Sequence, residues 1–148
     1  MKFKIVETEH IHQGVVKYIK KDFSFDTEPI INEIDYELAY NKVTLTVVDK
    51  QVVQIWGFSG GDTKRVKLNQ NIPQYKRGIL MVEGEFEYDL CYSINKVSVQ
   101  VYENEKTGWF CIGDPKFEGE GVEFINKCIA FIDNEGLLMS LWIKPLYV

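Results

Sequence analysis

Short strand-like segments joined by tight turns fill the middle of this sequence and constrain its fold more than any other feature. The clearest pair is 43–48 and 51–56, two β-branched and apolar runs that flank Asp49 and Lys50 as a two-residue hairpin turn. Because a parallel crossover needs about a dozen residues or more, short connections predict antiparallel neighbours. Further strands are predicted at 2–6, 30–40, 64–68, 79–82, 85–92, 97–102 and 108–112.

Two segments have helical periodicity. In 9–22, Ile11, Val15 and Tyr18 fall on one helical face, although Gly14 disfavours a helix there. In 121–133, apolar residues also recur at helical spacing, and Asn134-Glu135-Gly136 would end that helix. The residues with this spacing are Val122, Ile125, Cys128, Ile129 and Ile132. A loop is predicted at 24–29.

The end of the sequence predicts a central strand. Residues 137–143 are apolar on both parities apart from Ser140, which is typical of a strand covered on both faces. The sum is one domain over residues 1–148, in the α+β class and mainly β: a curved antiparallel sheet of short strands with one or two packed helices. The alternative is an all-β sandwich or small barrel in which 122–132 form a strand.

Composition and cysteine use point to a soluble globular protein. Hydrophobic residues make up 45% of the 148, and no apolar run approaches the roughly 20 residues that cross a bilayer. The first residues have no signal-peptide pattern, so a cytoplasmic location is expected. The three cysteines give no disulfide framework and are expected to be buried reduced thiols. They are Cys91, Cys111 and Cys128.

No catalytic or metal-binding signature is found. The two histidines, His10 and His12, cannot supply the three or four ligands of a zinc site, and no Cys-x-x-Cys motif is present. No serine lies in Gly-x-Ser-x-Gly. Gly60 and Gly61 before Lys64 have the composition of a phosphate loop without its spacing, so 59–62 are predicted to be a hairpin turn. We therefore expect no catalytic residue, metal or cofactor.

An acidic row is the most specific feature. Four carboxylates recur at every second position from 83 to 89, so on a strand they would line one face. They are Glu83, Glu85, Glu87 and Asp89. Residues 83–135 hold twelve acids and four lysines, a net of −8, whereas residues 1–82 hold ten acids and twelve Lys or Arg, a net of +2. The row is either the solvated face of a one-sided sheet, paired in part with Lys64, Arg65 and Lys67, or a docking surface.

Tryptophans offer the alternative site. Trp56, Trp109 and Trp142 lie in or beside predicted strands, where they either pack in the core or line a ligand pocket. Nucleic-acid binding is disfavoured, because an isoelectric point near 5.1 opposes contact with phosphates. No membrane partner is expected.

Two functions are therefore predicted. The first is a non-enzymatic protein-binding domain, possibly an acidic inhibitor that neutralises a basic toxin or nuclease by direct binding. Bacterial immunity proteins often have such a profile, as do many unrelated proteins. The second is a small-molecule-binding β domain or minor enzyme with an aromatic-lined pocket.

Overall fold

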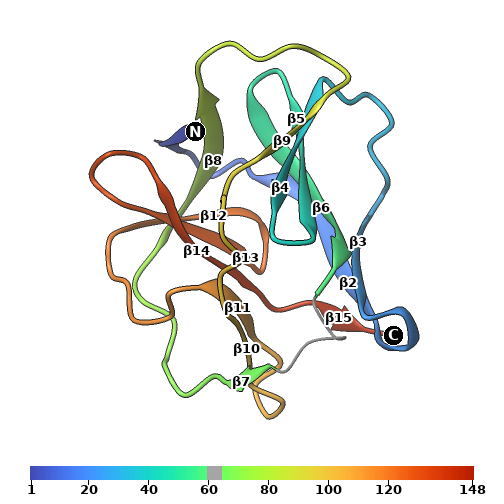
Figure 1. Ribbon diagram of the computed structural model, residues 1–148, viewed down its shortest axis with the longest axis vertical. Coiled ribbons are helices and arrows are strands. Elements are labelled where there is room, and N and C mark those ends of the chain that lie inside the picture. Colours follow the sequence, from blue (N-terminus) through green and yellow to red (C-terminus); the bar gives the residue numbers. More distant parts are fainter. Residues whose placement is uncertain (60–64) are drawn as a thin grey trace.

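The protein is almost entirely β in the computed structural model, which describes residues 1–59 and 65–148 (Figure 1). No α-helix occurs in these two ranges, and the one helical turn is the 3-10 turn η1 (Lys20–Asp22). The strands are β1 (Lys2–Glu7), β2 (His12–Ile19), β3 (Ser24–Glu28), β4 (Tyr36–Tyr40), β5 (Val43–Val48), β6 (Gln51–Phe58), β7 (Val66–Lys67), β8 (Lys76–Glu83), β9 (Cys91–Ser93), β10 (Val101–Glu103), β11 (Phe110–Gly113), β12 (Glu120–Asn126), β13 (Cys128–Ile132), β14 (Leu138–Ile143) and β15 (Leu146–Tyr147).

Hydrogen-bonded pairing joins all the strands into one strongly curved sheet. The main order is β7-β10-β11-β14-β13-β12-β2-β3-β6-β5-β4-β9. Strand β8 pairs with β1, β12 and β6, so the path β12-β2-β3-β6-β8 returns to β12. The absence of α-helices from residues 1–59 and 65–148 contradicts the predicted α+β fold with packed helices, and the closed circuit fits the all-β alternative with a small barrel.

The predicted helix at 121–133 is wrong. These residues form the antiparallel hairpin β12–β13, with Lys127 in the left-handed region at φ 62°. The residues with helical spacing are all buried, but so are Phe124 and Phe131 between them. A hairpin covered on both faces is apolar at almost every position, so a subset of its residues matches a helical period without a helix being present.

The predictions for 9–22 and 24–29 are also wrong. The first segment is mainly strand β2, in which Val16 and Tyr18 are buried and their neighbours are not. The second is strand β3, whose Phe25 and Thr27 are buried at the same period of two. Packing of this alternating face outweighs local propensity.

Two local predictions are confirmed. Strands β5 and β6 form the expected hairpin, and both turn residues have positive φ, 49° at Asp49 and 63° at Lys50, as tight hairpin turns require. Strand β14 lies between β11 and β13. Leu141 and Ile143 belong to the main core, and Trp142 belongs to a second cluster with Phe131.

Several predicted strands are shorter than expected. Of the strand predicted at 30–40, only residues 36–40 form β4. Within the predicted 64–68, residues 66–67 form β7, and within the predicted 97–102, residues 101–102 begin β10. In 85–92 only the last two residues belong to a strand, β9. The turn predicted at 59–62 lies mostly outside the described residues. Within the described part of the chain, no helix is long and apolar enough to cross a membrane.

Candidate functional site

The acidic row forms an irregular segment instead of a strand face. Strand β8 ends at Glu83, Gly84 has φ +99°, and residues 84–90 cross the upper end of the molecule toward β9 (Figure 1). We name residues 84–90 the acidic strap. The predicted strand at 85–92 fails because a chain that turns at Gly84 and again at Asp89, where φ is 63°, cannot keep alternate residues on one face.

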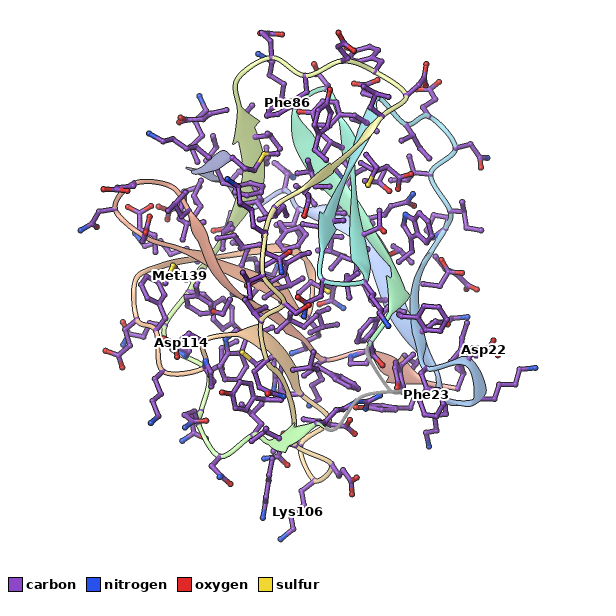
Figure 2. All side chains as sticks on the ribbon, viewed as in Figure 1. Asp22, Phe23, Phe86, Lys106, Asp114 and Met139 are labelled. Atoms are coloured by element: carbon purple, nitrogen blue, oxygen red, sulfur yellow. The ribbon has the colours of Figure 1, made fainter. Side chains whose placement is uncertain are left out.

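One aromatic side chain anchors the acidic strap. Phe86 is half-buried, with its ring centroid 5.4 Å from that of Tyr36 and 4.9 Å from that of Tyr92 (Figure 2). The Asp89 N–H donates to the Asp35 carbonyl at 2.7 Å. The strap is therefore fixed on β4 by one inward ring and by backbone hydrogen bonds, while its other side chains remain in solvent.

The carboxylates of the strap lie near two others that the sequence pattern did not single out. The Asp49 N–H donates to the Asp35 carboxylate at 2.7 Å, which holds the β5–β6 turn against the segment that also bonds the strap. Glu85 accepts a hydrogen bond from Lys50 at 2.8 Å, and this bond raises the pKa of Lys50. Glu87 and Asp89 are exposed.

Exposed apolar side chains accompany these charges. Tyr88 is 65% exposed and Leu90 is 47% exposed, both within the acidic strap. Tyrosine is one of the residues that most often anchors protein interfaces. Below the strap the hydroxyl of Tyr36 is buried, and burial together with nearby Asp35 and Glu85 raises its pKa. The surface can therefore combine electrostatic attraction with an apolar contact.

The fourth predicted carboxylate lies apart from the strap proper. Glu83 is the last residue of β8, is exposed, and stands opposite Lys2 of β1. Of the cross-strand partners suggested by the sequence, Lys64 lies outside the described residues, and the other two engage β10 instead of the row. Arg65 pairs with Glu103, and Lys67 pairs through its backbone with the same strand, β10.

The three tryptophans do not line one pocket. Trp109 and Trp142 contact each other edge to face with ring centroids 6.2 Å apart, in the second core cluster. Trp56 is 42% exposed on β6, where its indole N–H donates to Glu37 at 2.6 Å. Of the three predicted pocket residues, Trp142 is buried, Trp109 is half-buried and Trp56 is the most exposed.

A groove of about 400 Å³ lies beside Trp56, between β3, β6 and the segment that follows β3. Ile30 and Ile34 form its apolar wall and are exposed. The side chain of Gln54 fixes this wall, since it accepts a hydrogen bond from the Ile31 N–H at 3.0 Å and donates to the Ile31 carbonyl at 3.3 Å. The sequence does not indicate this groove, because a long-range contact forms it.

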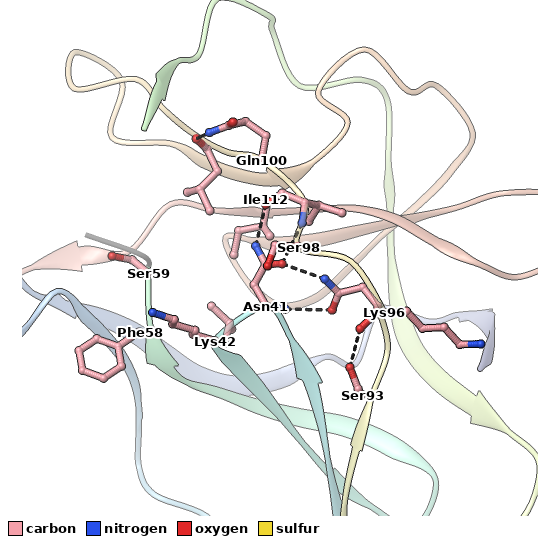
Figure 3. Close-up of a pocket in the computed structure, with 13 residues that line it drawn as sticks. Asn41, Lys42, Phe58, Ser59, Ser93, Lys96, Ser98, Gln100 and Ile112 are labelled. Carbon is pink, nitrogen blue, oxygen red and sulfur yellow. Dashed lines mark hydrogen bonds between the residues drawn. The ribbon is translucent and has the colours of Figure 1, made fainter. Parts of the chain in front are cut away.

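A second cavity of about 420 Å³ lies beside the β4–β5 turn (Figure 3). Its amides are engaged in the fold. The side chain of Asn41 donates to the Val99 carbonyl at 2.8 Å, and Asn95 donates to the Asn41 side-chain oxygen at 2.8 Å. These bonds fasten residues 93–100 to the turn, so they explain the polar lining without a ligand.

Ser59 belongs to a buried polar cluster. The Arg65 guanidinium donates to the Tyr18 hydroxyl at 2.7 Å and to the Ser59 hydroxyl at 2.8 Å, and it pairs with Glu103. The same guanidinium lies over the Phe110 ring, 5.1 Å from its centroid. The cluster satisfies the half-buried guanidinium, and among the described residues its hydrogen-bond and ion-pair partners include neither histidine.

The cysteine prediction is correct for two residues of three. Cys111 and Cys128 are buried, whereas Cys91 is exposed on β9. Although the residue is exposed, partial desolvation of its thiol and nearby Glu37 raise the pKa of Cys91, which disfavours the reactive thiolate. His10 is exposed and His12 is half-buried. Over residues 1–59 and 65–148, no group of three or more His, Cys, Asp or Glu could hold a metal ion.

No protein-family model matches the chain, and no curated protein matches its sequence.

Proposed function

We propose that this chain is a non-enzymatic protein-binding domain whose partner is basic. The docking surface is the acidic strap with Asp35 and Asp49. The observation that carries the proposal is the way the strap is held: Phe86 anchors it, while Tyr88 and the three carboxylates are exposed, of which Glu85 pairs with Lys50. An exposed aromatic side chain can contact a partner directly, and the negative charge around it speeds association and selects partners by charge.

The specific form of this proposal is an acidic inhibitor that covers the site of a basic toxin or nuclease. Negative charge gathered on one surface favours contact with a surface that binds phosphates. A fixed strap also loses less conformational entropy on binding than a disordered one would. Co-expression with the protein encoded beside it tests this form, since growth should be rescued if that neighbour is toxic.

A capture experiment tests the docking surface. Immobilised full chain is compared with a variant carrying Glu85→Lys, Glu87→Lys and Asp89→Lys, using lysate of the cells that encode the protein. The wild type should retain a basic partner in stoichiometric amount, less so as salt rises, and the variant should lose it. The control variant reverses the same number of exposed carboxylates elsewhere on the surface, with Asp22→Lys, Glu105→Lys and Glu118→Lys. Capture that survives reversal of the strap would refute the proposal.

A second candidate function is small-molecule binding at the Trp56 groove. It is supported by an apolar space of about 400 Å³ with an exposed indole on its wall. This volume lies within the roughly 300–1,000 Å³ of small-ligand pockets. A screen of small cyclic compounds should yield ligands that quench tryptophan fluorescence in wild type and lose affinity in Trp56→Ala, with Tyr88→Ala as the control. Affinity unchanged in Trp56→Ala would exclude the groove.

A further inference from the structure

Within residues 1–59 and 65–148, β1 forms a ladder with one strand only. Its partner is β8, in antiparallel register. The Thr8 N–H donates to the Arg77 carbonyl of the strand beside it at 3.2 Å, so even-numbered residues of this segment bond toward β8. The Phe3 N–H instead donates to the Gly136 carbonyl at 2.8 Å, away from β8. Because antiparallel pairs alternate in this way, odd-numbered residues direct their backbone groups outward.

Two of these odd-numbered residues have free outward edges. Beyond Phe3, the outward N–H and C=O groups of Ile5 and Glu7 have no hydrogen-bond partner among the residues that the structure describes. Ile5 is half-buried and Glu7 is exposed. An edge of this kind is a template for another strand.

Open space runs along this edge. A cavity of about 750 Å³ is lined by residues 2–5 and, across from them, by residues 132–136. A cavity of about 450 Å³ continues past Glu7. Ile5 and Glu120 line both cavities, so the two form one groove beside β1. We name it the β1 groove.

Carboxylates outnumber ammonium groups along the β1 groove. Lys76 pairs with Glu7 at 3.4 Å, and both side chains are exposed. The acidic side chains of the groove are Glu7, Glu83, Glu120, Asp133 and Glu135, and the basic ones are Lys2, Lys4 and Lys76. Glu83 also adjoins the acidic strap, so the groove extends the negative surface around the end of β8.

We infer that the β1 groove accepts an extended, Lys- or Arg-bearing segment of a partner protein as an added strand on β1. The basic character of the partner rests on the proposed function; the site itself rests on the free edge. Main-chain hydrogen bonds to Ile5 and Glu7 supply affinity, and alternate side chains of the added segment supply specificity. Cationic side chains on it face Glu120 and Glu135 across the groove.

Selection from random peptides displayed on phage, with the full chain as bait, tests this inference. Recovered peptides should be rich in Lys and Arg, and proline should be excluded from alternate positions. Addition of a synthesised peptide to the isotope-labelled chain should shift the backbone amide signals of Ile5 and Glu7 in NMR spectra. If no peptide is recovered, or if the shifted amides lie elsewhere, the inference is wrong.

A matched pair of variants distinguishes the contribution of the Glu7 backbone N–H to peptide binding from that of its side chain. Glu7→Pro and Glu7→Ala both remove the carboxylate, but only proline removes the outward N–H, which no described group uses. Peptide affinity should fall roughly tenfold more in Glu7→Pro than in Glu7→Ala. Circular dichroism checks that both variants fold. Equal affinities in two folded variants would overturn strand addition.

Two further outcomes distinguish this inference from the proposed function and from self-association. The strap variant with Glu85→Lys, Glu87→Lys and Asp89→Lys should lose the protein partner yet still bind the selected peptides. Peptide binding that disappears with the strap places the site there and refutes the β1 groove. Sedimentation that shows a dimer broken by Glu7→Pro but not by Glu7→Ala would make the occupant a second copy, contrary to the inference.

Discussion

The β12–β13 hairpin and the acidic strap hold their carboxylates in opposite ways. Glu123 of the hairpin is 4% exposed, accepts a hydrogen bond from the Lys127 N–H at 3.0 Å and pairs with Arg77 at 3.2 Å. The Glu85 side chain of the strap is 88% exposed and pairs with Lys50, whose side chain is also exposed. The hairpin buries its carboxylate among hydrogen-bond and ion-pair partners, whereas the strap leaves its carboxylates exposed to solvent.

The anchoring differs in the same sense. The hairpin is packed on both faces, with Phe124 in the main core and Phe131 in the second cluster. The strap depends on Phe86 and a few backbone hydrogen bonds. Segments with few buried contacts are the ones that open locally and can adapt to a ligand. Substitutions in the two regions should therefore separate global from local stability.

The largest effect is expected in the hairpin. Phe124→Ala removes a side chain with no exposed surface and should lower the free energy of unfolding by about 3–5 kcal/mol, because a cavity remains in a closely packed core. Chemical denaturation followed by circular dichroism measures it. A loss similar to that in Phe86→Ala would erase the distinction between the two regions.

A matched pair of carboxylate substitutions comes next. Glu123→Leu removes the acceptor of the part-buried Lys127 N–H and the partner of Arg77, and should cost about 1–3 kcal/mol. Glu85→Leu removes only a solvent-exposed ion pair, so the free energy of unfolding should hardly change. The denaturation midpoints of the two variants, measured at low and high salt, test this difference. A larger loss of stability in Glu85→Leu than in Glu123→Leu would contradict the prediction.

Phe86→Ala should have a smaller global effect. A half-buried ring contributes about 1–2 kcal/mol, but its removal should release the whole strap. Hydrogen exchange at the amides of Glu87 and Asp89 should become much faster, while exchange in β12 stays unchanged. Unchanged exchange in the strap would mean that the backbone bonds alone fix it.

The smallest expected effect concerns pH. Burial lowers the pKa of His12, which pairs with Ile125 of the hairpin, below the ordinary value of 6.5. The unfolded chain therefore takes up this proton first, so the free energy of unfolding should decrease as pH falls below about 6.5. Thermal unfolding across this range should show the decrease in wild type and less of it in His12→Gln. A free energy of unfolding that increases on acidification would contradict this prediction.

The sequence correctly predicted two elements that depend on neighbouring residues alone. The Asp49-Lys50 hairpin depends on two adjacent residues that tolerate positive φ, and β14 depends on a run that is apolar on both parities. The hairpin at 120–132 could not be told from a helix, because full burial removes the alternation that marks a strand.

The acidic strap escaped prediction for the opposite reason. Its alternation is present in the sequence, but Phe86 packs inward while Tyr88, of the same parity, is 65% exposed. A strand would place both rings on one face. The part of the site contributed by Asp35 and Asp49 depends on contacts between distant segments, and the groove beside Trp56 depends on Gln54 in the same way. Neither has a signal in any single stretch of residues.

Strand β14 couples the two hydrophobic clusters of the molecule, because it contributes Leu141 and Ile143 to one and Trp142 to the other. Because its side chains lie in both clusters, loss of the strand should open both at once. The domain should consequently melt as a single cooperative unit. Fluorescence from the buried indole and the far-ultraviolet signal of the whole sheet should then trace superimposable transitions.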